Sequence, residues 1–258
     1  MGTKQQVIED LFQHCKSRNT WEFDNALVRH YAEKNGFGNP FDVTKIDNSS
    51  LLPQILRDED YFIVHLGQGR HRFVKGVLLG YHRFEEVEPA EMIDWKYRPS
   101  TLNEFDTSES NILSVASNQR ILHDFLYGDI VASPKVYNAR RTKANLTYKV
   151  GGETISAVNV QIETDLTLEH HGIVTVVEGK NGFPEDFAVY QIFHPFKYYD
   201  LLRQANRLSI QQITTCYVLR KREANRSILR LYNYTFEDAN ELGSVTLLKK
   251  AQYNLVRR

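Results

Sequence analysis

The sequence predicts an α+β fold in which an N-terminal helical domain is followed by a mixed β-sheet flanked by helices. Three observations indicate it: apolar residues recur at helical spacing in the first 60 residues, they alternate at a period of two beyond residue 145, and a strongly acidic segment separates the two parts. The 258 residues suggest one or two domains, and a chain of this length can fold without disulfides or a structural metal.

The N-terminal part, residues 1–84, is predicted to contain helices followed by a hairpin. Residues 4–17 and 20–34 carry apolar stripes at helical spacing, with Thr20 as the candidate N-cap of the second helix, and a short helix follows the cluster 47–50. Two β-rich pieces, 61–66 and 71–75, then flank the turn Gly67-Gln68-Gly69. Three short helices and a basic hairpin are typical of a winged helix, a DNA-binding module. A small helical domain without a ligand is the alternative.

Residues 85–110 are predicted to be an acidic linker, because they contain Pro89, Pro99 and eight acids against two bases. The second domain, residues 111–258, is expected to begin with a helix over 111–127 that Gly128 ends. Strands follow on both sides of the Gly151-Gly152 turn and of the His171-Gly172 turn. A helix over 185–206, which Pro195 must kink or split, precedes strands at 213–221, 227–236 and 245–248.

Composition excludes several classes of protein. Cys15 and Cys216 are too few for a disulfide framework, so we expect reduced thiols and a cytoplasmic protein. No apolar run is long enough to span a membrane, and the N-terminus lacks a signal-peptide core. There is no glycine-rich phosphate loop, so no nucleotide cofactor is expected.

The net charge of zero conceals basic runs over 65–83, 132–150 and 201–230, of which the first two contain no acid. One such run is usually a solvated surface, whereas three runs favour a basic binding face. The candidate DNA-binding residues are Arg70, Arg72 and Lys75 on the hairpin, and Arg140, Arg141 and Lys143 before the second hairpin.

The most informative segment is residues 160–180. Its first strand alternates apolar residues with Glu163 and Asp165, and its second strand is apolar until Glu178 and Lys180. A hairpin centred on the His171-Gly172 turn places Asp165 opposite Glu178, an arrangement that destabilises a sheet unless a cation lies between them. Two carboxylates at that separation suit Mg²⁺, beside which Lys180 could orient or deprotonate a water. A slip of one residue would put the two acids on opposite faces.

Asp165 followed by Glu178-Gly179-Lys180 resembles the core motif of the PD-(D/E)XK nuclease superfamily, an acid on one strand and Glu-x-Lys on the next. The elements expected over residues 110–240 also resemble the order in that family. The resemblance implies an α/β nuclease core in which Asp165 and Glu178 bind Mg²⁺ and Gly179 lends its backbone carbonyl. Glu163 is the alternative first ligand, and Thr164 stands where the family often has proline.

The resemblance implies two further roles. A glutamine on the helix after the motif assists some members, and Gln191 is similarly placed. The family's first helix sometimes adds an acid, for which Asp124 is the candidate within 111–127.

The expected function is a Mg²⁺-dependent, sequence-specific endonuclease of double-stranded DNA, similar to a Type II restriction enzyme and acting as a homodimer by analogy. The alternatives are a repair-type nuclease of the same superfamily and a non-catalytic winged-helix DNA-binding regulator.

Overall fold

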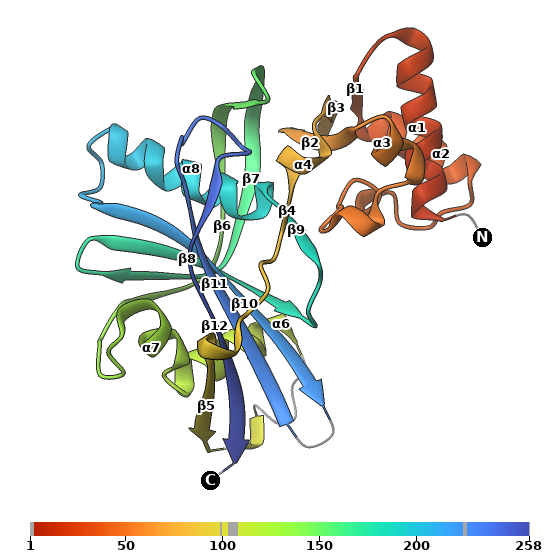
Figure 1. Cartoon of the computed structure of the whole chain (residues 1–258). Helices are drawn as coiled ribbons and strands as arrows, with labels where there is room; N and C mark the ends of the chain where they lie inside the picture. The colour runs from red at the N-terminus through yellow and green to blue at the C-terminus, as the bar shows by residue number, and fades with distance from the viewer. Residues whose placement is uncertain (1–2, 99, 103–107, 224–225, 258) are drawn as a thin grey trace.

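The structure is a computed structural model that describes residues 3–98, 100–102, 108–223 and 226–257. Figure 1 shows a small N-terminal part beside a large twisted sheet with helices on both faces. The expected α+β class, with a mixed sheet flanked by helices, is confirmed. Among the described residues, none of the helices combines the length and the apolar character that crossing a membrane requires.

The N-terminal part packs helices against a three-stranded sheet of order β1-β3-β2. Its hairpin agrees with the predicted strands and its first helix with the predicted range, because Thr3 caps that helix and its apolar stripe is buried. Its elements are α1 (Lys4–Arg18), β1 (Glu22–Asp24), α2 (Asn25–Lys34), the 3-10 turns η1 (Pro40–Asp42) and η2 (Ser49–Leu51), α3 (Gln54–Asp58), β2 (Tyr61–Gly67) and β3 (Arg70–Lys75).

The predicted start of the second helix at Thr20 is wrong. Residues 22–24 pair with β3, so the chain is extended there. The carboxylate of Asp24 accepts a hydrogen bond from the backbone N–H of Leu27 and thereby caps α2. Pairing with a distant strand therefore decides where this helix begins.

The large sheet has the order β5-β12-β11-β10-β8-β7-β6 within the described residues. β8 runs parallel to β10, and β12 runs parallel to β5, whereas the other neighbouring pairs are antiparallel. The strands are β5 (Met92–Tyr97), β6 (Lys135–Val150), β7 (Glu153–His170), β8 (Ile173–Asn181), β10 (Gln212–Glu223), β11 (Arg226–Phe236) and β12 (Val245–Arg257).

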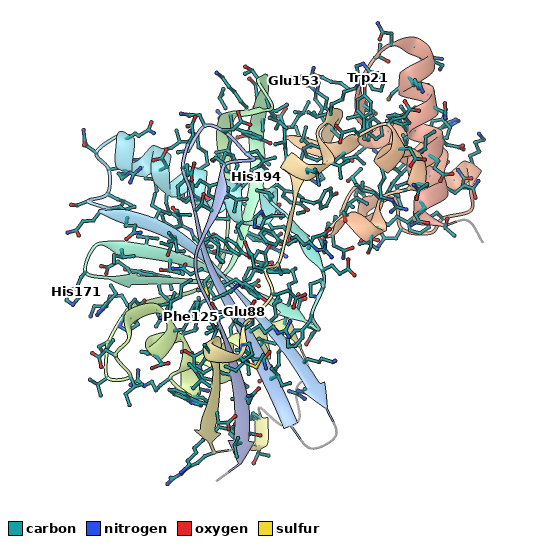
Figure 2. All side chains as sticks on the ribbon, viewed as in Figure 1. Trp21, Glu88, Phe125, Glu153, His171 and His194 are labelled. Carbon is teal, nitrogen blue, oxygen red and sulfur yellow. The ribbon has the colours of Figure 1, made fainter. Side chains whose placement is uncertain are left out.

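Helices cover both faces of this sheet. α6 (Glu109–Asn118) and α7 (Ile121–Tyr127) bury their apolar side chains on one face, and α8 (Tyr190–Gln204) lies on the other. Figure 2 shows Phe125 of α7 and His194 of α8 well apart. Both side chains are buried, each with the helix that covers one face of the sheet. The helix predicted over 111–127 is interrupted at Arg120, whose φ of 61° is left-handed, and α8 continues through Pro195 instead of splitting there.

The acidic segment 85–110 is not simply a linker, which corrects the expectation. Residues 92–97 form β5, which pairs with the end of β12 at the edge of the sheet. Its side chains alternate in exposure, so Asp94 and Lys96 face solvent while Tyr97 is buried. An edge strand tolerates such charges, which is why the composition resembles that of a linker. Pro99, Glu104 and Asp106 lie outside the described residues.

The N-terminal part and the sheet share one buried core. A single apolar cluster extends from α1 through the β2–β3 hairpin to β6, β7 and α8. Short elements reinforce this junction, since β4 (Tyr81–Arg83) pairs with β9 (Asp186–Ala188) directly before α8. The remaining elements are α4 (Val77–Gly80) and the 3-10 turn η3 (Pro89–Glu91). The two parts are therefore joined by packing and not only by a connecting chain.

Candidate functional site

Asp165 and Glu178 lie together where β7 and β8 separate. The hairpin has the predicted register from the His170–Ile173 pair, and its ladder ends at the pair of Leu166 and Val177. Immediately beyond it, the backbone N–H of Gly179 donates a hydrogen bond of 3.1 Å to Oδ2 of Asp165. This bond holds the carboxylate of β7 against the backbone of β8 next to Glu178.

The surroundings of the Glu178 carboxylate are electrostatically unfavourable for its charged form. Burial raises its pKa to about 8, and the neighbouring charge of Asp165 adds to the increase. Nζ of Lys180 lies 3.2 Å from Oε1 of Glu178. Burial alone would lower the pKa of Lys180, but the carboxylates of Glu178 and Glu109 raise it on balance. Lys180 therefore remains a cation, and Glu178 lacks a sufficient counter-charge.

Glu109 is a member of this cluster that the sequence did not indicate. It lies in the first turn of α6, and its Oε2 is 4.0 Å from Nζ of Lys180. α6 approaches β8 so closely that a Cβ at Gly179 would lie 3.1 Å from the carbonyl oxygen of Glu109. The signal was the Ser108 cap, which starts the helix two residues before the predicted range.

Asp124, the acid expected from the first helix, does not reach the cluster. It lies on α7 and accepts a hydrogen bond of 2.7 Å from the hydroxyl of Tyr253. Glu163 is also separate, because it is half exposed, pairs with Arg141 at 3.0 Å and accepts a hydrogen bond from Gln161. Asp165, and not Glu163, is the residue beside Glu178.

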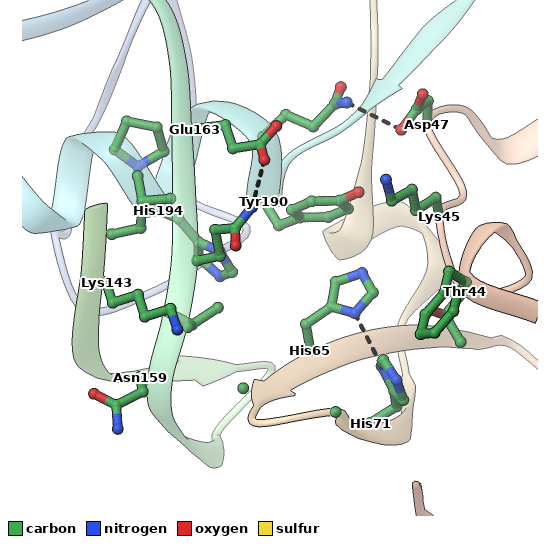
Figure 3. A pocket seen from close by; sticks show the side chains of 18 of the residues that line it. Thr44, Lys45, Asp47, His65, His71, Lys143, Asn159, Glu163, Tyr190 and His194 are labelled. Carbon is green, nitrogen blue, oxygen red and sulfur yellow. Dashed lines mark hydrogen bonds between the residues drawn. The ribbon is translucent and has the colours of Figure 1, made fainter. Parts of the chain in front are cut away.

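The cluster forms part of a pocket of about 720 Å³ that both parts of the chain line. Figure 3 shows Lys45 and His65 from the N-terminal part facing Glu163 and Tyr190 from β7 and α8. Gln191 lines this pocket. Its amide donates to Oδ1 of Asp47 at 3.0 Å, and its carbonyl oxygen accepts from the hydroxyl of Tyr217 at 3.1 Å. The N-terminal part is thus hydrogen-bonded to α8 at the site.

The basic candidates on the first hairpin are occupied by contacts within the chain. Arg70 pairs with Glu22, and Arg72 pairs with Glu153 at the start of β7. Figure 2 shows Glu153 at the tip of the long β6–β7 hairpin, near the N-terminal part. The ammonium group of Lys75 lies over the ring of Tyr61.

The turn of this hairpin is packed against β7. Gly67 has a φ of 78°, and a Cβ there would lie 2.0 Å from the carbonyl oxygen of Val158. Close backbone contact within the chain explains the glycine.

The basic candidates on β6 differ in their surroundings. Arg140 and Arg141 are exposed, and Arg141 forms an ion pair with Glu163. Lys143 is exposed and lines the pocket. Lys143 is therefore the candidate that can meet a ligand next to the carboxylates.

The oxygen atoms of Asp165 and Glu178 suit a Mg²⁺ ion, because two neighbouring carboxylates repel each other and hard oxygen ligands are those that Mg²⁺ prefers. Among the described residues, no group of three or more His, Cys, Asp or Glu side chains is arranged to hold a metal ion. Mg²⁺ commonly binds through one or two carboxylates and completes its shell with water and substrate phosphate.

Comparison with known families divides the chain near residue 75. Residues 5–73 match a family described as a domain of unknown function, DUF6996. Residues 77–254, more than half of the chain, match another, described as a domain of unknown function, DUF6997. No curated protein and no solved structure matched the chain. The chain therefore belongs to the DUF6997 family.

Proposed function

We propose that this protein is a Mg²⁺-dependent nuclease that hydrolyses phosphodiester bonds of double-stranded DNA. The observation that carries the proposal is the convergence of Asp165, Glu178 and Lys180 at one pocket, with Glu178 buried and short of positive charge. Strong perturbation of a carboxylate in a cleft is typical of functional sites.

The arrangement of elements supports the resemblance to the PD-(D/E)XK superfamily. Helices α6 and α7 precede the β6–β7–β8 meander, α8 crosses the sheet, and β10 then lies parallel to β8. Asp165 lies on β7, and Glu178 and Lys180 lie on the neighbouring strand β8.

Each residue has a defined role in this proposal. Asp165 and Glu178 would hold Mg²⁺, and Glu109 adds negative charge at the entrance of the cluster. When bound, Mg²⁺ supplies a Lewis acid that stabilises charge on the phosphate. The pKa of Lys180 is raised by the neighbouring carboxylates, and its ammonium group would orient the attacking water by donating a hydrogen bond.

The N-terminal part supports a DNA-reading role. Its element order, α1-β1-α2-α3-β2-β3 with the sheet order β1-β3-β2, resembles a winged helix. Since the hairpin turn is packed against β7, contacts with phosphates would instead come from exposed lysines at the pocket, such as Lys45 and Lys143. A DNA-recognition domain joined to a cleavage domain fits a sequence-specific restriction enzyme, which would act as a homodimer.

A cleavage assay tests the proposal. The purified full chain is incubated with unmethylated phage DNA and Mg²⁺. Discrete fragments support a restriction enzyme, whereas a smear indicates a repair-type nuclease of the superfamily. Unchanged DNA that is nevertheless bound would refute the nuclease and favour a non-catalytic regulator.

Matched variants link any cleavage to the site. Glu178→Gln and Asp165→Asn are each expected to lower the cleavage rate by about 100-fold or more, because each removes a metal ligand. Glu169→Gln, four residues from Asp165 on the same strand and not part of the pocket lining, should stay within about threefold of the wild type. Equal losses in all three variants would show that the assignment of Asp165 and Glu178 is wrong.

A further inference from the structure

A histidine pair lies on the wall of the pocket that the N-terminal part forms. The Nδ1 atoms of His65 and His71 are 3.0 Å apart, and Nε2 of His71 lies 2.9 Å from Oδ1 of Asn25. The amide oxygen only accepts, so Nε2 of His71 donates to it. Burial lowers the pKa of both rings, to about 4 and about 3, so both are neutral near pH 7. Nδ1 of His71 then accepts from His65, which leaves Nε2 of His65 as an acceptor.

This acceptor lies near other polar groups that can still form hydrogen bonds. Figure 3 shows the second ring nitrogen of His65 directed away from His71, toward the space between Tyr190 and Lys45. The rings of His65 and Tyr190 meet edge to face, with centroids 5.2 Å apart. Within the described parts of the chain, Nζ of Lys45, the hydroxyl of Tyr190 and Nε2 of His65 make no hydrogen bond. A cation, a hydroxyl and a neutral acceptor therefore converge on one space.

An aromatic ring completes this wall. Phe41 also lines the pocket, and it is 65% exposed although it lies in the turn next to buried Val43. An exposed aromatic ring at the edge of a polar pocket is a platform on which a planar ligand can stack.

We propose that this wall is a subsite for the base of one unpaired nucleotide of the DNA substrate. The inference rests on the proposed function and names the part of the substrate that the pocket takes. Phe41 would stack on the base, Nε2 of His65 would accept from a base N–H, and Lys45 would contact a phosphate next to it.

We infer an unpaired nucleotide because the site is too deep for a base that stays paired in a duplex. His65 is largely enclosed, and the pocket has the size of a small-molecule site. A base that remains stacked in a duplex presents only its groove edges, which cannot enter such a pocket. Enzymes that bind a base in a pocket accept it from a strand where it is already unpaired or extrude it.

Binding to duplexes of equal length tests the subsite. The full chain, with Ca²⁺ in place of Mg²⁺, is titrated with labelled 30-base-pair DNA that is fully paired, carries a one-nucleotide bulge, or carries a bulged abasic residue. We expect the bulge to bind about tenfold more tightly than the paired duplex, because no pair has to be opened, and the abasic bulge to lose most of this gain. Equal affinities, or an abasic bulge that binds as well as the normal bulge, would overturn the subsite.

Surface variants assign the effect to this wall. Phe41→Ala and Lys45→Ala should remove the preference for the bulge, while Lys96→Ala, an exposed lysine on β5, should preserve it. A preference that all three variants keep would also overturn the subsite.

Parallel reactions with Mg²⁺ separate this inference from the nuclease. Cleavage without any bulge preference would refute the subsite but not the nuclease proposal. A bulge preference that depends on Phe41, without cleavage, would refute the nuclease proposal but not the subsite.

Discussion

At the scale of single residues, Glu178 has the least favourable electrostatic environment of the candidate site. Its carboxylate is largely buried beside Asp165, and one ammonium group, that of Lys180, lies within 4 Å. A protein that keeps such a group charged needs a compensating cation. A raised pKa in the metal-free protein and the Mg²⁺ binding that we propose would thus have the same cause, two carboxylates with too little positive charge beside them.

The stability of the metal-free protein should depend on pH through Glu178. Its folded pKa of about 8 exceeds the ordinary value of 4.5, so the folded state retains a proton that the unfolded state releases. Stability is therefore lost as the pH rises from 4.5 to 8. Glu178→Gln removes this loss, and its unfolding free energy relative to the wild type should increase by on the order of 2–4 kcal/mol between pH 5 and pH 8.5.

Urea denaturation in EDTA at both pH values measures this difference. Glu163→Gln is the matched control, because Glu163 is exposed and lies outside the buried cluster. A relative stability of Glu178→Gln that does not change with pH would contradict the environment described for this carboxylate.

The buried histidines should act in the opposite direction. The pKa values of His65 and His71 are lowered by burial to about 4 and about 3, so their stabilising contribution is present above pH 6.5 and is lost as the pH falls below it. At pH 5 each ring should cost about 2 kcal/mol relative to pH 7. His71→Gln should reduce this acid sensitivity, and His30→Gln, at an exposed position on α2, should not. Thermal unfolding across pH 5–7 decides it; equal slopes in both variants would argue against a buried, neutral pair.

At the scale of elements, the β2–β3 hairpin joins the two parts of the chain. Its turn presses against β7, and Arg72 pairs with Glu153 at the start of that strand. A hairpin with a basic tip suggests a DNA-binding wing when only its residues are considered. Packed as it is, the same tip positions His65 and His71 in the pocket.

Gly67→Ala tests this role of the turn. The added Cβ would lie 2.0 Å from a backbone oxygen of β7 and would sit at a φ of 78°, so both a clash and backbone strain result. We expect a loss of about 3 kcal/mol or more in the unfolding free energy. Gly128→Ala is the control for strain alone, because its φ is 64° and a Cβ there meets nothing within 4 Å. It should cost about 1–2 kcal/mol, and equal losses for both variants would show that contact with β7 does not matter.

At the scale of the whole molecule, the two family matches meet near residue 75, yet the core does not divide there. Buried side chains of α1 and of the first hairpin belong to the same cluster as those of β6, β7 and α8. The sequence divides into two family matches, whereas the packing joins both parts in one apolar core.

A fragment of residues 100–258 should therefore fail to fold on its own. It lacks β5 at the sheet edge, and it exposes the apolar face of β7 and α8 that the N-terminal part covers. Exposed apolar area of that kind costs about 25 cal/mol per Å². The full chain should unfold in a single transition by calorimetry, and the fragment should lack near-ultraviolet circular dichroism. A fragment with a cooperative transition of its own would show that the shared core is dispensable.

Local patterns in the sequence determined a large part of this protein. Alternation in 160–169 and the turn at His171-Gly172 predicted the hairpin and its register, which brings Asp165 next to Glu178. The apolar stripe of α1 and the two β-rich pieces of the first hairpin were equally clear. These features depend on neighbours in sequence, through the period of a strand or helix and the geometry of a tight turn.

Tertiary structure alone decided the rest. It placed β5 in the sheet, brought Glu109 rather than Asp124 to Lys180, paired Arg70 and Arg72 with acids, and closed the pocket between the two parts of the chain. Each of these contacts joins segments that are far apart in sequence. They form where the faces of helices and sheets pack together. A local pattern of apolar residues shows which face of an element is buried, but not which distant element covers that face.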